Sequence, residues 1–407
     1  MGIISIVIKY VTFIRIFFMR QVVKRKRAEN NDIKPMDCIY TILVDGNSLL
    51  KLSLVDKRMN NNGQEYGAVY NFLRILGNLL SKRDFNHCVC CWDGYNSGVL
   101  RYNLYPDYKA NRDKHYELMG GSSDYDRQIA EYCKKVLKYH SKKNLEVERS
   151  RGETDDEIFQ RQRSILMEIL DNLYVRQFIY DDVEGDDLIA NYVHNKKENE
   201  RVVIVSGDRD IVQLISDEVC LYIPSLKKFV TPDNCVELLG YRHDNVVLKK
   251  IICGDASDNI KGVKGIGEST LNKLFPEILT EKTDLNAILA RSKELLDERK
   301  AAKKKPLKTL ENVLNGVTDG CQGDKLYEIN SKIIDLSEPM LTDEAIQGMN
   351  DEMYAAIDSE DRNVKNVYNI ISENGMDDLL DERKFGSIFG LYNRIMVKEL
   401  EYAQKNS

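Results

Sequence analysis

The sequence predicts an α/β fold in which helices flank a mostly parallel central sheet. Two observations lead to this prediction. First, short apolar runs of strand length alternate along the chain with segments whose apolar residues recur every three or four positions. Such alternation is typical of a parallel sheet with helices on both faces. Second, four of the apolar runs, or the turns after them, end in acidic residues, and the active sites of open α/β sheets lie beyond the carboxyl ends of the strands.

Five strands are expected, each an apolar run bounded by turn residues. In chain order they are CIYTILVDG (38–46), HCVCCWDG (87–94), YVRQFIY (174–180), RVVIVSGDRD (201–210) and VCLYIP (219–224). Amphipathic helices are expected at 66–81, after the first strand, and at about 155–173, before the third. The polar segment 113–155 is expected to be an insertion outside the core.

The composition is that of a soluble globular protein with one large or two modest cores. The chain has 407 residues, of which 43% are hydrophobic and 30% charged. Its net charge of −6 argues against a nucleic-acid binder, unless the acids gather in one metal site and the bases lie elsewhere. The nine cysteines lie mostly in apolar runs and indicate a reducing compartment. Cys88 and Cys91 have CxxC spacing, but no second pair completes a zinc site.

The first 35 residues are an apolar stretch interrupted by Lys9, Arg15 and Arg20. These charges argue against a membrane span, and no small-residue cleavage site indicates a signal peptide. An amphipathic helix on a membrane surface is one interpretation. We favour the other, an extension before a folded protein that starts near Met36. The expected location is intracellular and cytoplasmic, in the host cytoplasm if the source is viral, with no stable membrane partner.

Acidic residues follow the expected strands and one glycine-containing loop. A single acid after a strand is more often a turn or helix-capping residue. Five acidic groups at the same expected edge carry more weight, and hard divalent cations fit them because no histidine lies in these motifs. Two Mg²⁺ or Mn²⁺ ions about 3.5–4 Å apart can activate water and stabilise the leaving oxygen of a phosphodiester. The candidate metal ligands are Asp45, Asp93, Glu184, Asp186, Asp187, Asp208, Asp210, Asp255 and Asp258.

The segment GVKGIGESTLNKLF (262–275) places a glycine-rich turn before a helix. Backbone amides in such a turn can face a phosphate at the start of the helix. Apolar residues between the glycines indicate a helix–hairpin–helix that binds duplex without sequence preference. The alternative is a tight turn between two helices. The candidate DNA-binding residues here are Gly262, Lys264, Gly265 and Gly267.

Two basic segments accompany these motifs. In RYNLYPDYKANRDK (101–114), a helix beginning at Pro106 would bring Tyr108, Lys109 and Arg112 to one face. The cations could hold the scissile phosphate, and the tyrosine could stack on a terminal base. The alternative is a solvated basic helix end. The run ERKAAKKKPLK (298–308) either follows a DNA backbone or is a solvated linker.

The chain resembles the 5′-nuclease superfamily, which includes flap endonucleases, the 5′-nuclease domain of bacterial DNA polymerase I, and phage 5′ exonucleases and ribonucleases H. The matching stretches lie within about residues 38–280, and NSKIIDLS (330–337) is similar to a later piece of the phage branch. They are VDGNSLL, CWDG, YPDYKANRD, VEGDDLIA, SGDRDIVQL and GDASDNIKGVKGIGESTLNKL. The resemblance implies a PIN/resolvase-like sheet, a helical arch over the active site, and a helix–three-turn–helix DNA-binding module.

The resemblance also implies roles for the candidate residues. Asp45, Asp93, Glu184 and Asp186 would surround one Mg²⁺, while Asp187, Asp208, Asp210 and Asp258 would serve the second, with Asp255 nearby. Lys109 and Arg112 would contact the scissile phosphate. Tyr108 would stack on a base, Arg101 would be a further DNA contact, and the turn at 262–267 would bind duplex DNA, where some members also hold a K⁺ ion.

The implied function is a structure-specific 5′ nuclease, acting as a monomer on 5′ flaps, 5′ ends and RNA–DNA hybrids in replication or repair. The expected domains are an extension (1–35), a nuclease domain (36–245) with its arch at about 113–155, a helical DNA-binding domain (246–345) and a helical C-terminal segment (346–407). A PIN-type single-strand ribonuclease and a non-catalytic DNA-structure-binding homologue are the alternatives. A haloacid-dehalogenase phosphatase would need a second aspartate where Asn47 stands.

Overall fold

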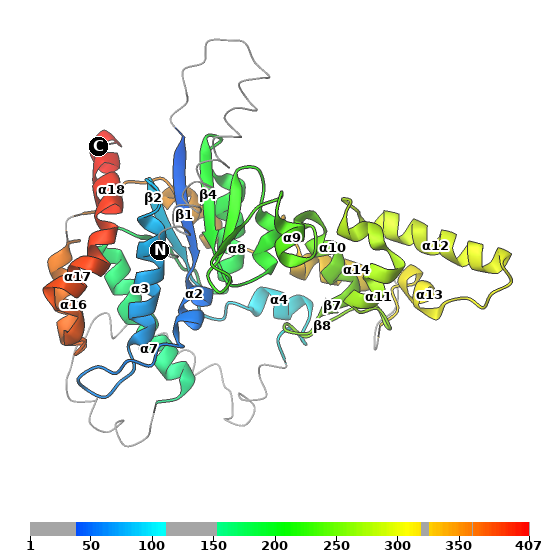
Figure 1. Cartoon of the computed structure of the whole chain (residues 1–407), viewed down its shortest axis with the longest axis horizontal. Helices are drawn as coiled ribbons and strands as arrows, with labels where there is room; N and C mark the ends of the chain where they lie inside the picture. The colour runs from blue at the N-terminus through cyan, green and yellow to red at the C-terminus, as the bar shows by residue number, and fades with distance from the viewer. Residues whose placement is uncertain (1–37, 111–152, 319–324, 360, 407) are drawn as a thin grey trace, which may run out of the picture.

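The computed structural model describes residues 38–110, 153–318, 325–359 and 361–406. Its main sheet has six strands in the order β3-β2-β1-β4-β5-β6 (Figure 1). All neighbouring pairs are parallel except the last, β5 with β6. The predicted strands are confirmed as β1 (Ile39–Asp45), β2 (His87–Cys91), β3 (Arg176–Phe178), β4 (Glu200–Val205) and β5 (Val219–Ile223). The antiparallel β6 (Lys228–Val230) was not predicted, because three residues carry no periodicity.

Two hydrophobic cores lie on opposite faces of this sheet. One face is covered by α3 (Gly67–Leu80) and α7 (Asp155–Asn172), both of which the sequence predicts. A capping box at Thr154 and Glu157 fixes the start of α7. The other face is covered by α8 (Gly185–Asn195), whose Leu188 and Ile189 are fully buried. The parallel strands therefore have helices on both faces, as the alternation of elements predicts.

The last helices of the described chain pack on the α3 face of the sheet. They are α16 (Val364–Glu373), α17 (Glu382–Phe389) and α18 (Asn393–Asn406), and they lie beside α3 and α7 in Figure 1. Val367, Phe389 and Tyr392 are buried in the same core as α3. The C-terminal segment therefore shares a core with the sheet.

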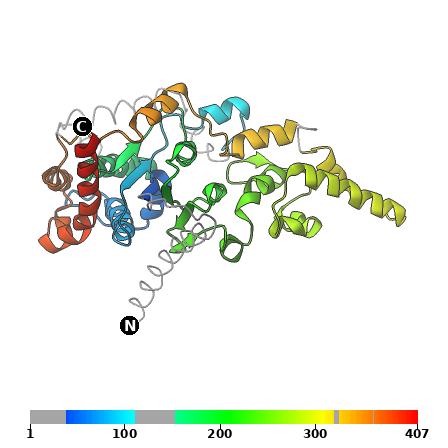
Figure 2. The ribbon, with the colours of Figure 1, turned by 90° about the horizontal axis from the view of Figure 1, so that it is seen from above.

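A third core lies in a group of helices at the other end of the molecule (Figures 1 and 2). It is built from α10 (Val246–Cys253), α11 (Glu268–Leu274), α12 (Leu285–Ala301), α13 (Lys308–Leu314) and α14 (Lys325–Ile334). From α14 the chain returns to the sheet, where α15 (Asp343–Glu352) contributes Met349 to the core around α8. The helical group is thus inserted between two segments that pack on the sheet.

The short helix α4 (Val99–Leu104) ends before Pro106. The prediction of a helix that starts at Pro106 is wrong. Residues 106–110 instead form consecutive turns. The Lys109 amide donates to the Asp258 carbonyl at 2.8 Å, and the Asn259 side chain donates to the Asp107 carbonyl at 2.7 Å. These contacts with a distant loop take the hydrogen-bonding groups that a helix would use.

Several expectations fall on residues outside the described ranges. These are the extension 1–35, nearly all of the arch at 113–155, and Arg112. Among the described helices, none is long and apolar enough to cross a membrane.

Candidate active site at the carboxyl edge of the sheet

Asp45 ends β1 and joins two neighbouring strands through hydrogen bonds. Its carboxylate accepts from the Ser48 amide at 2.9 Å, which caps α2 (Gly46–Ser53), and from the Ser206 hydroxyl after β4 at 2.6 Å. The next residue must be glycine, because a Cβ on Gly46 would lie 2.4 Å from the Trp92 ring. The side chain of Asp45 is buried yet faces the edge where β1, β2 and β4 end.

Asp93 follows β2 and is fixed by the segments on either side of it. Its carboxylate accepts hydrogen bonds from the Gly185 amide at 2.8 Å and from the Asn47 side chain. Gly185 is the first residue of α8, so this bond ties the end of β2 to the start of the helix that carries Asp186. Asn47 is therefore a site residue, although the sequence did not predict it.

The acids around Asp186 lie close enough to repel one another. Burial raises the pKa of Asp186 well above its ordinary value, and the charges of Asp45, Asp208, Asp93 and Glu184 raise it further. Burial also raises the pKa of Asp45 to about 7, opposed by its bonds from Ser206 and Ser48 and assisted by Asp93 and Asp208. Within the described residues, the Asp186 carboxylate accepts no hydrogen bond. The edge therefore gathers more negative charge than its own groups neutralise.

The raised pKa of Asp45 predicts an unusual dependence of stability on pH in the absence of metal. The folded-state pKa of Asp45, about 7, lies above the ordinary carboxyl value of about 4. The folded chain thus binds a proton that the unfolded chain has released, and the free energy of unfolding falls as the pH rises from about 4 to 7. In EDTA, urea denaturation should show lower stability at pH 8 than at pH 5.5, and Mg²⁺ should remove the difference. A chain that is more stable at pH 8 in EDTA would contradict this.

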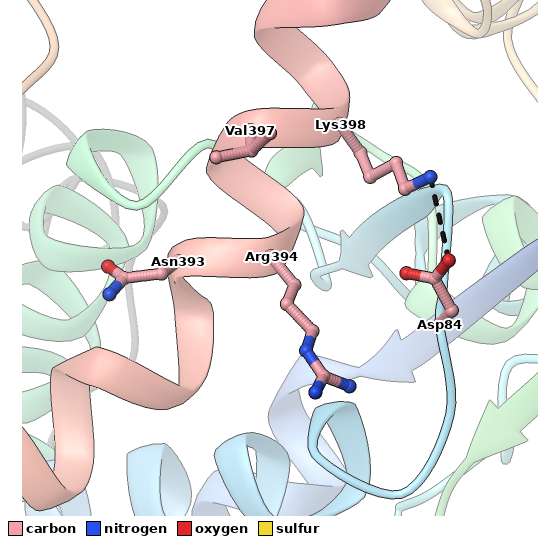
Figure 3. Close-up of a pocket in the computed structure, with 5 residues that line it drawn as sticks. All are labelled: Asp84, Asn393, Arg394, Val397 and Lys398. Atoms are coloured by element: carbon pink, nitrogen blue, oxygen red, sulfur yellow. Dashed lines mark ion pairs between the residues drawn. The ribbon is translucent and has the colours of Figure 1, made fainter.

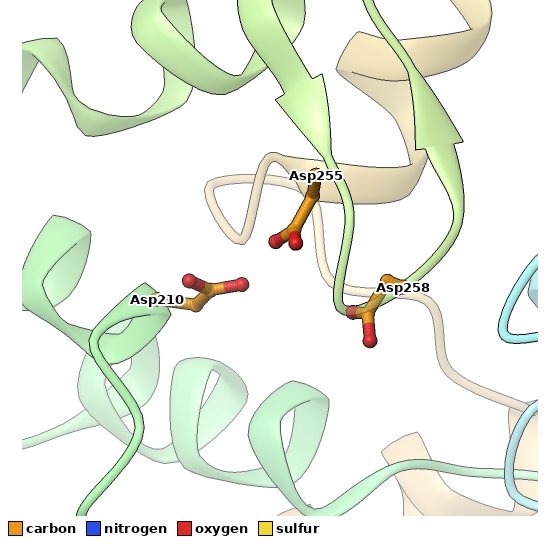
Figure 4. A group of neighbouring side chains, drawn as sticks. All are labelled: Asp210, Asp255 and Asp258. Atoms are coloured by element: carbon orange, nitrogen blue, oxygen red, sulfur yellow. The ribbon is translucent and has the colours of Figure 1, made fainter. Parts of the chain in front are cut away.

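A second acidic group lies where the helical group meets the sheet. Ligand atoms of Asp210, Asp255 and Asp258 lie within 4.8 Å of one another (Figure 4). Asp210 begins the 3₁₀ helix η3 (Asp210–Leu214) after β4, and Asp255 ends the short strand β7 (Gly254–Asp255). Asp258 lies in the turn before β8 (Ile260–Lys261). Asp210 thus comes from the sheet, and Asp255 and Asp258 come from the helical group.

Lys250 on α10 lies between two of these carboxylates. The sequence did not predict this residue as part of the site. Its ammonium contacts Asp210 and lies 2.5 Å from Asp255. Burial raises the pKa of Asp210 to about 6, with Asp208 adding to the rise and Lys250 opposing it. Burial would raise the pKa of Asp255 as well, but hydrogen bonds from Lys250 and Ser257 hold it below its ordinary value. Lys250 therefore supplies one of the positive charges that this group needs.

Arg101 supplies positive charge to the start of α8 from inside the protein. It is 5% exposed, and its guanidinium donates to both oxygens of Asp187 at 2.5 and 3.0 Å. It also lies 3.0 Å from Glu184 and donates to the Ile333 carbonyl. The Asp187 carboxylate accepts a further bond from the Met340 amide. Contact of Arg101 with DNA, or of Asp187 with a metal, would require these buried bonds to break.

Replacing Arg101 with methionine should destabilise the fold. The change leaves the buried Asp187 without its cation, and removing one partner of a buried pair typically costs about 3–5 kcal/mol. Urea denaturation followed by circular dichroism measures the loss. The matched control is the double variant Arg101→Met, Asp187→Leu, which should recover part of the stability because no buried charge is left alone. A single variant as stable as the parent would show that the pair is dispensable.

Tyr108 and Lys109 both reach Glu184, the residue before α8. The Tyr108 hydroxyl donates to Glu184 at 3.0 Å, and its ring, 2% exposed, belongs to the core of the helical group. Stacking on a terminal base would require the ring to leave this position. The Lys109 ammonium lies 2.5 Å from Glu184, and about a fifth of its side chain is exposed. Of these two residues, Lys109 is the one placed to reach a bound phosphate at the edge.

The glycine-rich turn at 262–267 joins α10 and α11 through close backbone contacts. A Cβ on Gly262 would lie 2.1 Å from the Cys253 carbonyl carbon, and Gly265 has a φ of +85°. Val263 and Ile266 are buried, whereas Lys264 and Gly267 face outward. The predicted arrangement of two helices around a turn, with apolar residues between the glycines, is confirmed. DNA binding by this turn stays a prediction.

The residues around α18 form a surface pocket apart from the acids (Figure 3). Asn393, Arg394, Val397 and Lys398 line it together with Asp84, which lies 3.5 Å from the Lys398 ammonium. None of the candidate metal ligands lines this pocket. The pocket therefore contributes nothing to the site at the carboxyl edge.

Residues 40–240, which contain the sheet and most of the acids, match the family model of the 5′-3′ exonuclease N-terminal resolvase-like domain. The chain belongs to the 5′-nuclease superfamily. Among curated relatives of the chain, DNA polymerase I of Thermus thermophilus is 38% identical over 239 residues, or 58% of this chain and 24% of that protein. DNA polymerase I of Bacillus subtilis is 27% identical over 265 residues, or 63% of this chain and 26% of that protein. The chain thus spans about a quarter of the length of these relatives.

Solved structures share the fold of this chain. A bacteriophage T5 protein crystallised with metal ions aligns with a TM-score of 0.50 and 17% identity, over 84% of this chain and 98% of that chain. The T5 5′-exonuclease with bound zinc aligns with a TM-score of 0.50 and 18% identity, over 82% and 99% of the two chains. The likeness extends beyond residues 40–240, because it covers more than four fifths of this chain.

Proposed function

We propose that this 5′-nuclease is a divalent-metal-dependent, structure-specific phosphodiesterase that cleaves DNA at 5′ flaps and 5′ ends. The observation that carries the proposal is the convergence of acids from β1, β2, α8 and β4 at one edge, in a site whose buried carboxylates hold raised pKa values. The match to a 5′-3′ exonuclease domain supports the reaction. A solved flap endonuclease of bacteriophage T5, with a TM-score of 0.50, holds DNA and metal ions.

The acids fit divalent cations because their carboxylates are oxygen ligands at an edge where negative charges crowd around Asp186. Asp45, Asp93, Glu184 and Asp186 would hold one Mg²⁺ or Mn²⁺ ion, and Asp208, Asp210 and Asp258 the other, with Asp255 nearby. When bound, two such ions activate a water and stabilise the leaving oxygen of a phosphodiester. Asp187, fully engaged by Arg101 and Met340, is proposed to position α8 rather than to bind metal.

The chain's own groups would orient the substrate. Lys109 would pair with the scissile phosphate at the edge, while its present partner Glu184 turns to metal. Lys264 and the exposed glycines of the turn at 262–267 would hold the backbone of the duplex, with K⁺ at the turn carbonyls. The duplex would then lie against the helical group, and the end to be cut would reach the carboxyl edge.

The finer features of the proposal follow the superfamily. Substrates would include RNA–DNA hybrids such as primers, the reaction would serve replication or repair, and the protein would act as a monomer in the cytoplasm. A PIN-type single-strand ribonuclease is less well supported, because the chain adds a helix–turn–helix beyond the resolvase-like domain.

Two matched flap substrates test the proposal. A duplex with a labelled 5′ flap should be cut near the junction in Mg²⁺, whereas the same duplex with a 3′ flap should remain intact. EDTA should stop the reaction, and excess Mn²⁺ should restore it. Equal cleavage of both polarities, or of single strands alone, would refute the assignment as a structure-specific 5′ nuclease.

A further inference from the structure

The link between α12 and α13 carries a concentration of positive charge on an otherwise acidic chain. We call residues 299–308 the basic loop. It contains Arg299, Lys300, Lys303, Lys304, Lys305 and Lys308, and no acid. The four lysines from 303 to 308 are exposed. The basic loop lies at the tip of the projecting helical group, at the right-hand end of Figures 1 and 2.

Helix electrostatics explain only part of this charge. Arg299 and Lys300 lie in the last turn of α12, where cations are favoured by the helix dipole. Lys308, however, is the first residue of α13, and Lys305 lies three residues before it. Cations are disfavoured at a helix N-terminus. Helix electrostatics therefore account for Lys303 and Lys304, which directly follow the C-cap of α12 at Ala302, but not for Lys305 and Lys308.

The basic loop is held in a defined shape that leaves its lysines outward. The Lys304 amide donates to the Arg299 carbonyl at 2.8 Å, and the Arg299 side chain donates to the Lys305 carbonyl at 3.0 Å. Among the residues that the structure describes, no carboxylate forms an ion pair with Lys303, Lys304, Lys305 or Lys308. An extended surface of one sign, with its charges not neutralised, fits a partner with regularly spaced negative charges.

The basic loop lies next to the turn at 262–267, because α13, which follows the loop, contacts this turn. The Asn312 side chain on α13 donates to the Lys264 carbonyl at 2.8 Å, and the Lys264 amide donates to the Val317 carbonyl at 2.7 Å. The space over Gly265 is closed by Thr309, whose methyl carbon would lie 3.2 Å from a Cβ there. Lys308 therefore adjoins the turn, and the rest of the basic loop leads away from it.

We propose that the basic loop is a second contact surface for the phosphate backbone of a nucleic-acid duplex, continuous with the turn. This rests on the proposed function, in which the turn holds that duplex. The five-residue step from Lys303 to Lys308 reaches at most about 17 Å, or roughly five base pairs along one strand. An acidic protein would match the sign of the charge, but it would not account for the continuity with the turn.

Salt dependence of binding tests the proposal. The probe is a fluorescein-labelled 30-base-pair duplex, titrated with protein in Ca²⁺ at several KCl concentrations and followed by anisotropy. Replacing Lys303, Lys304 and Lys305 with glutamine should lower the slope of log affinity against log salt by about 2.7, since each phosphate contact contributes about 0.9. The matched control removes the same charge on α16 and α17, through Lys365→Gln, Arg383→Gln and Lys384→Gln, and should keep the parent slope.

A basic-loop variant with the parent slope would overturn the proposal, as would a control variant with an equal fall, because either result denies a local contact. Circular dichroism melting curves that match the parent confirm that the exposed substitutions leave the fold intact. The binding reaction contains no cleavage step. A chain that fails to cut the 5′ flap but shows the expected fall in slope would refute the proposed nuclease and retain the duplex contact.

Discussion

Replacing Asp186 with asparagine should abolish cleavage of a 5′ flap while making the metal-free protein more stable. The loss of activity and the gain of stability have the same origin, the Asp186 carboxylate. The Asp186 carboxylate is surrounded by the charges of Asp45, Asp208, Asp93 and Glu184, so its loss relieves repulsion in the folded chain. The same loss removes a proposed metal ligand, and metal stabilisation of the transition state accounts for several kcal/mol, or at least about 10³ in rate.

Three measurements on this variant separate a catalytic role from a structural one. Single-turnover cleavage in Mg²⁺ gives the rate, and urea denaturation in EDTA gives the stability. Duplex affinity in Ca²⁺ should be unchanged or tighter, because phosphate meets one anion fewer. Asp181→Asn, an exposed acid in the turn before α8, is the matched control and should leave all three values near those of the parent. Near-normal cleavage by Asp186→Asn would remove Asp186 from the metal site.

Replacing Lys109 with alanine should lower the single-turnover rate by about 10²–10³ and leave duplex affinity nearly unchanged. The Lys109 ammonium lies 2.5 Å from Glu184 at the carboxyl edge, where charge would build on the phosphate. Electrostatic contacts that strengthen in the transition state have effects of this size. Lys109→Arg is the conservative control and should recover part of the rate, since it restores the charge but not the shape of the ammonium.

Lys264→Ala is a control that should affect binding and not rate, the opposite of Lys109→Ala. Lys264 lies in the turn at 262–267, so its loss should weaken duplex binding and lower the salt slope by about 1. At saturating enzyme this variant should retain most of the parent rate. If Lys109→Ala cleaves at the parent rate, or if both variants show the same small effects, Lys109 is one solvated charge among many.

The part of the site that lies on the sheet could be predicted from the sequence because it depends on local patterns. Apolar runs fix where β1, β2 and β4 end, and parallel pairing then brings Asp45, Asp93 and the acids after β4 to one edge. The start of α8 follows β3 by the same logic. For these residues, strand ends and chain order contain most of the spatial information.

The cations around the acids could not be placed in this way. Lys250 reaches Asp210, forty residues away in the sequence, only because α10 packs beside the sheet, although its contact with Asp255 is local. Arg101 and Tyr108 were predicted to meet DNA, but tertiary packing buries both against Glu184 and Asp187. Asn47 had a readable signal, since it stands two residues after Asp45 at the same strand end. Long-range packing, rather than periodicity, decides which charges are buried.

We propose that the acids at the carboxyl edge hold the divalent ions needed for phosphodiester cleavage. The most direct test is the single-turnover rate of 5′-flap cleavage as a function of free Mg²⁺, in a buffer that starts from EDTA. We expect no cleavage in EDTA and, at low Mg²⁺, a rate that rises more steeply than in proportion to the ion concentration, because two ions are required. Cleavage that persists in EDTA at the rate seen in Mg²⁺ would contradict the proposal.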